Sequence, residues 1–248
     1  MFRRVFLVGI LAGFVAGLAL TTLEQLKLAP LIAAAEVYES AAEPHQDAMP
    51  AMANAAQAWE PSPGFERIAL TFLAEFVIAA GFGLVLSGGF ALREACSGQI
   101  AGAREGLLWG FAGFAAFALA PALGLPPEPP GMVSADILAR QGWWLGTALA
   151  TACGIGLLVF GRHWAAHALG IAVIILPQLI GAPARPEGSD AVTADIAAHF
   201  VAASLVTSAV FWILLGSVAG WLYAAAGKRG AARGDVLRAS KAPARQAR

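Results

Sequence analysis

The sequence predicts an all-α protein, a polytopic membrane bundle of six transmembrane helices with both termini in the cytoplasm. Three observations predict it: a surplus of apolar residues, six apolar runs long enough to span a bilayer, and basic residues gathered in alternate loops. Of the 248 residues 58% are hydrophobic and only 13% are charged, and the mean hydropathy is +0.69. Soluble domains carry about 25% charged residues, so this surplus of apolar surface needs lipid as its solvent.

The six runs match the thickness of a bilayer. A hydrocarbon core of about 30 Å requires roughly 20 helical residues, because each residue adds about 1.5 Å along the axis. Residues 161–163 alone separate the fourth run from the fifth, which predicts a tight hairpin, with a merged or tilted pair as the alternative. We expect one helix at each of these runs: Val5–Leu23, Ile68–Leu92, Gly106–Leu125, Gly142–Phe160, Trp164–Ala182 and Phe200–Tyr223.

Charge sets the expected orientation. With the N-terminus in the cytoplasm, twelve of the sixteen basic residues fall in cytoplasmic segments and four in outer ones, as the positive-inside rule requires. Among the acids only Glu94, Glu105 and Asp235 fall inside. We therefore divide the chain into a bundle over residues 1–226, with an acidic periplasmic loop at 24–67, and a basic cytoplasmic tail at 227–248, which we expect to be disordered.

The first apolar run has a second interpretation. Arg3 and Arg4 followed by an apolar stretch resemble a signal peptide, and cleavage would leave five helices in the same orientation. We favour a retained helix, because nineteen residues is long for the apolar part of a signal peptide and no Ala-x-Ala site follows directly.

Glycines at four-residue spacing predict close helix packing. Small residues at this spacing let helix backbones approach each other in lipid, where no hydrophobic effect drives association. A compact bundle explains these glycines without any further function: Gly9, Gly13 and Gly17, Gly106 and Gly110, Gly142 and Gly146, and Gly216 and Gly220.

The outer loop offers a candidate site for capturing metal ions. We expect a helix over Leu28–Glu43 that places Glu36, Glu39 and Glu43 on one face, with His45 directly after it. Like charges at this spacing repel, which a bound cation would relieve. Simple exposure of the carboxylates to water explains the pattern equally well.

Two further carboxylates are candidate metal sites. Glu75 is the one charged residue well inside an expected span, and intramembrane ionisable residues are functional candidates by default. Glu128 lies among four prolines at 126–130, where a stiff non-helical loop forms either a gate or an ordinary turn.

Several classes of function are excluded or disfavoured. Basic and acidic residues balance at sixteen each, which argues against a nucleic-acid binder, and no phosphate-binding loop motif occurs. We find no constellation of catalytic residues, so we expect no enzyme activity and no permanently bound cofactor. The two cysteines, Cys96 and Cys153, do not make a disulfide scaffold.

Several segments of the chain resemble the CbtA family of predicted cobalt transporter subunits. The most specific are residues 117–131 (FALAPALGLPPEPPG) and 140–144 (RQGWW), supported by 36–39 (EVYE), 177–183 (PQLIGAP) and 211–221 (FWILLGSVAGW). The resemblance implies a bacterial inner-membrane protein that handles cobalt for cobalamin synthesis, with a small single-span partner, CbtB. Family members often carry leucine where Pro129 stands and histidine where Gln178 stands, so one soft metal ligand is missing here.

The residues and the resemblance together favour a subunit for divalent-metal uptake, with cobalt(II) as the transported ion. Glu36, Glu39, Glu43 and His45 would capture the ion, Glu128 would stand at the mouth, and Glu75 would act within the membrane. The alternative is a structural membrane subunit that packs into a larger complex through its glycine faces. The order of metal affinities alone would favour nickel or copper, so the sequence does not select the metal.

Overall fold

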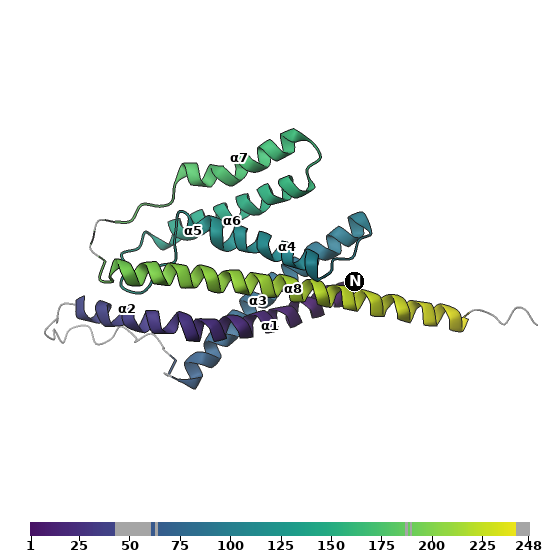
Figure 1. The fold of residues 1–248 in the computed structure, drawn as a ribbon, viewed down its shortest axis with the longest axis horizontal. Helices are drawn as coiled ribbons and strands as arrows, with labels where there is room; N and C mark the ends of the chain where they lie inside the picture. The colour runs from purple at the N-terminus through teal and green to yellow at the C-terminus, as the bar shows by residue number, and fades with distance from the viewer. Residues whose placement is uncertain (43–60, 63, 187, 189, 242–248) are drawn as a thin grey trace, which may run out of the picture. The chain divides into compact units, whose positions relative to one another are not determined.

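The computed structural model describes residues 1–42, 61–62, 64–186, 188 and 190–241, and this part of the chain contains helices and no strands (Figure 1). The expected all-α class is therefore confirmed. The elements are α1 (Phe2–Lys27), α2 (Ala29–Ala42), α3 (Phe65–Ser97), α4 (Ala103–Phe114), the π-helical segment η1 (Ala115–Leu119), α5 (Ala120–Ala122), α6 (Ile137–Phe160), α7 (Trp164–Ile180) and α8 (Ala194–Lys241).

Five helices in the described residues are long and apolar enough to cross a membrane. They correspond to five of the six expected runs: α1, α3, the continuous stretch Ala103–Ala122, α6, and the part of α8 up to Arg229. The remaining run forms α7, which has 17 residues and is about 25 Å long, just short of a bilayer core. Residues 161–163 separate α6 from α7, so these two helices are not merged.

Two expectations outside the spans have different outcomes. The helix expected from Leu28 is present as α2, directly after α1. The tail expected to be disordered from residue 227 instead continues α8 as helix to Lys241. A helix that has already formed extends at little cost, and Ala and Arg, which recur in this stretch, are strong helix formers.

The chain forms two compact units. The first comprises Met1–Gly17, Phe76–Gly110 and Ile213–Arg248, and the second comprises Leu18–Glu75 and Phe111–Trp212. The boundaries between the units fall inside α1, α3, α4 and α8.

Glycine-mediated backbone contacts hold the first unit together. A Cβ added at Gly13 of α1 would lie 2.6 Å from Cα of Ala80 in α3, and one added at Gly216 of α8 would lie 2.8 Å from Cα of Gly110 in α4. No side chain fits at such distances, so the expected packing role is confirmed for these faces. Gly142 and Gly146 of α6 have open space around them and do not serve this purpose.

The second unit contains the hairpin of α6 and α7, which lie side by side (Figure 1). They cross at Gly154 and Gly170, a contact that the four-residue spacings do not predict. Pro177 lies inside α7, and the next residue, Gln178, donates a hydrogen bond from Nε2 to the Ala120 carbonyl at 2.9 Å. That amide therefore joins α7 to the short helix α5.

Candidate functional site

Glu24 and Glu75 form a carboxylate pair in the second unit. Glu24 lies in the last turn of α1, Glu75 lies in α3, and each is partly buried. The two side chains are close enough for their charges to interact. Among the described residues neither Glu24 nor Glu75 forms an ion pair with a basic side chain, so no basic side chain offsets the charge of either carboxylate.

The sequence identified Glu75 but missed Glu24 as its partner. The expected first helix ended at Leu23 because a charged residue follows it, and this assigned Glu24 to the loop. In the structure α1 continues to Lys27, which places Glu24 on the helix. Charged residues within one turn of an apolar run are the signal that could have found it.

Glu128 lies in a cluster of charges made by two loops and the first turn of α6 in the second unit. Its carboxylate is 2.9 Å from a guanidinium nitrogen of Arg140 and 2.7 Å from one of Arg185, and the Ser134 hydroxyl donates to it at 2.7 Å. Only 6% of the Glu128 side chain is exposed. With three donors on two oxygens, this carboxylate is already neutralised, and a metal ion would have to displace an arginine to reach it.

Asp190 extends the same cluster. It accepts a hydrogen bond from the backbone N–H of Val133 at 2.9 Å and lies 3.9 Å from Arg185. The proline-rich loop after α5 and the loop before α8 are thus cross-linked by charge. The sequence expected a gate or a turn at Glu128, and the structure shows an ion-paired loop junction there.

The expected capture residues are described only in part. Glu36 is exposed on α2, and its nearest cation is Arg67 at 3.8 Å. Glu39 also lies within α2. Glu43 and His45 lie outside the described residues. No group of three or more His, Cys, Asp or Glu side chains able to hold a metal occurs in the described part of the chain.

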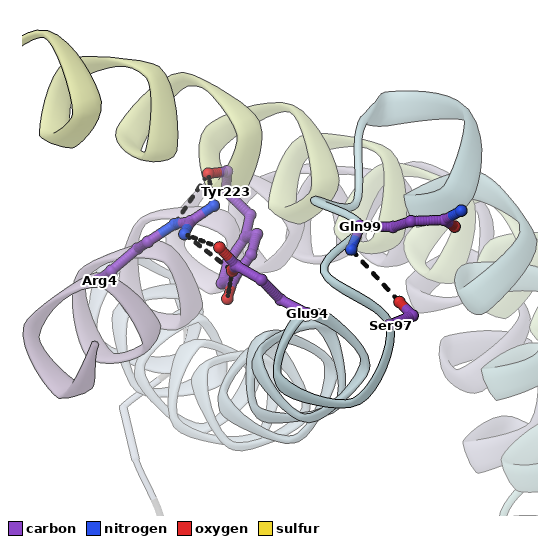
Figure 2. A network of polar contacts seen from close by, with 5 residues as sticks. All are labelled: Arg4, Glu94, Ser97, Gln99 and Tyr223. Carbon is purple, nitrogen blue, oxygen red and sulfur yellow. Dashed lines mark hydrogen bonds and ion pairs between the residues drawn. The ribbon is translucent and has the colours of Figure 1, made fainter.

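A second polar network lies in the first unit and was not predicted. The Arg4 guanidinium donates to both oxygens of Glu94, at 3.2 and 2.9 Å, and to the Tyr223 carbonyl at 2.6 and 3.0 Å. The Tyr223 hydroxyl donates to Glu94 at 2.6 Å, and the Arg4 guanidinium carbon lies 3.5 Å from the centre of the Tyr223 ring. Figure 2 shows these three side chains converging from α1, α3 and α8, with the Gln99–Ser97 contact nearby.

The network satisfies its members internally. Tyr223 is fully buried, and the side chains of Arg4 and Glu94 are 16% and 26% exposed. The arrangement therefore holds the start of α1, the end of α3 and α8 together, and we assign it a structural role.

Comparison with known proteins gives one finding. A family model described as "Probable cobalt transporter subunit (CbtA)" matches residues 2–224, which is most of the chain. No curated protein and no solved structure matches.

Proposed function

Because the chain belongs to the CbtA family of probable cobalt transporter subunits, we propose that it is a bacterial inner-membrane subunit for uptake of cobalt(II), supplying cobalamin synthesis. The observation that supports this most directly is the Glu24–Glu75 pair, two carboxylates without cationic partners in membrane-spanning helices. A charged carboxylate in the hydrocarbon core costs several kcal/mol, and a bound divalent ion would offset that cost for both carboxylates.

The proposed route begins at the acidic outer segment. Glu36, Glu39, Glu43 and His45 attract and capture the divalent ion by charge and by mixed oxygen and nitrogen ligation, which cobalt(II) accepts. Glu75, with Glu24 beside it, then binds the ion within the membrane. We give Glu128 the role of holding the loops at the mouth, because its oxygens are taken by Arg140 and Arg185.

The word subunit in the family description supports a partner, and we propose a small single-span protein of the CbtB kind. Cobalt is the cargo of this system, and we propose neither a resident cofactor nor a catalytic reaction. The second candidate function is a structural membrane subunit. The exposed Gly142 and Gly146 of α6 favour it, because the open space beside them leaves room for a helix of another subunit.

Uptake of radioactive cobalt separates the two functions. Cells carrying this chain and its partner should accumulate cobalt above cells carrying the partner alone, and Glu75→Gln should abolish the difference at unchanged protein level. Glu66→Gln is the matched control, because Glu66 is an exposed glutamate in the first turn of the same helix. Normal cobalt uptake by the Glu75→Gln protein would contradict the proposed metal route and support the structural role.

A further inference from the structure

A cavity of about 880 Å³ opens in the first unit beside the Arg4–Glu94–Tyr223 network. Its lining comes from the first residues of α1, the end of α3 and residues 221–229 of α8. Nothing in the proposed metal route uses it, since the carboxylates of that route lie in the second unit.

The charge of this cavity is positive. Three arginines line it, namely Arg3, Arg4 and Arg229, while Glu94 is the one acidic residue among the described residues of its lining. Glu94 is neutralised by Arg4 at 2.9 Å and by the Tyr223 hydroxyl at 2.6 Å. Arg3 and Arg229 are exposed and form no ion pair within the described part of the chain, so two positive charges are left for a ligand.

The remaining wall is apolar and exposed. Leu7 and Leu11 of α1 and Trp221 of α8 line the cavity with 46%, 51% and 61% of their surface accessible. The two arginines flank apolar helical stretches, because Arg3 is the second residue of α1 and Arg229 follows shortly after the apolar residues 221–227 of α8. The cavity therefore has basic residues at headgroup depth and leucines one to two turns deeper, and tryptophan is a common residue at this interface.

We propose that this cavity binds one anionic phospholipid. The guanidiniums of Arg3 and Arg229 hold the headgroup phosphate by charge-assisted hydrogen bonds, and an acyl chain lies along Leu7, Leu11 and Trp221. The apolar wall next to the cations favours a lipid over a free phosphate ion, which would leave that wall uncovered. The site is independent of metal transport.

The experiment measures lipid binding to the purified full-length protein in detergent, by native mass spectrometry and by thermal stabilisation. Phosphatidylglycerol should bind, while zwitterionic phosphatidylcholine should bind roughly tenfold or more weakly, and inorganic phosphate should neither stabilise the protein nor compete. Arg3→Gln/Arg229→Gln should lose this preference, while Arg3→Lys/Arg229→Lys should keep part of it, because the charge remains. Both variants leave Arg4 and its network intact, so both should fold.

Arg104→Gln/Arg162→Gln is the matched control, since it removes two exposed arginines that do not line the cavity. It should bind phosphatidylglycerol as the unmodified protein does. Equal binding of the two lipids, an equal loss in the control, or competition by inorganic phosphate would each overturn the proposal, the last by indicating an anion site in place of a lipid site.

Discussion

Glu94 joins side chains of α1 and α8 to α3 in the first unit. It accepts hydrogen bonds from Arg4 and from the Tyr223 hydroxyl, and it is about three-quarters buried. Replacing Arg4 by Gln leaves the carboxylate without its cation, which should lower the free energy of unfolding by about 1–3 kcal/mol. Tyr223→Phe removes one hydroxyl and should cost about 1 kcal/mol.

Chemical unfolding in detergent measures these losses, with Arg104→Gln, an exposed arginine, as the control. Arg4→Gln and Glu94→Gln should be strongly non-additive, because each substitution breaks the same contact. Strictly additive losses would show that the two residues stabilise the protein separately.

Glu128 invites a different prediction, because its contacts join two loops. Glu128→Gln removes the charge that holds Arg140 and Arg185, so the backbone amides of residues 131–135, Ala184 and Arg185 should exchange with deuterium faster, while those of α6 and α7 stay protected. Asp195→Asn changes an exposed acid of the same unit and should leave these amides unaffected. Unchanged exchange in Glu128→Gln would mean that the prolines alone fix the loop.

At the scale of the helices, the sequence predicted most of what the structure contains. Hydropathy located the five candidate membrane-spanning helices and the shorter α7. It could do so because a helix that crosses a bilayer needs about 20 consecutive apolar residues, which are visible in the sequence. The glycine spacing also identified α1, α4 and α8 as closely packed. It could not say which helix meets which, and it gave equal weight to Gly142 and Gly146, which meet nothing.

The contrast between Gly13 and Gly142 gives a prediction for the helices. Leucine at Gly13 would push α1 from α3, since even a Cβ would lie 2.6 Å from the Ala80 backbone, and we expect a loss of about 1–3 kcal/mol in the free energy of unfolding. Leucine at Gly142 enters open space and should change this free energy by less than about 0.5 kcal/mol. Equal losses at the two positions would show that packing is not what Gly13 provides.

The candidate sites were less predictable than the helices, because they depend on contacts across the sequence. Arg4 and Tyr223 are 219 residues apart, and no local pattern joins them. Glu128 stood out in the proline-rich loop, but its partners, Arg140 in α6 and Arg185 in the loop before α8, are identified only by the folded structure. Glu75 was found because an acidic residue inside an apolar run is conspicuous in any sequence. Glu24 can be placed on a helix only when it is known that α1 continues to Lys27.

The orientation of the whole molecule rests on the distribution of basic residues, and one labelling experiment tests it. The Arg4–Glu94–Tyr223 network joins the start of α1 and the end of α3 to α8 in the first unit, so the side of the membrane that Cys96 occupies also reports the side of the start of α1. The topology expected from the sequence assigns twelve of the sixteen basic residues to that side, so by the positive-inside rule we expect it to face the cytoplasm. In a Cys153→Ala background, Cys96 should react with a membrane-impermeant maleimide only after the cells are permeabilised.

A second variant tests the outer side of the membrane. It carries Ala184→Cys together with Cys96→Ala and Cys153→Ala. Ala184 is exposed in the loop between α7 and α8, which the same rule places outside, so its thiol should react in intact spheroplasts. Labelling of Cys96 from outside, with protection of the cysteine at 184, would invert the molecule and put Glu36 and Glu39 on the cytoplasmic side. Charge attraction could then no longer gather cobalt for uptake, and the same acidic segment would instead serve release or export.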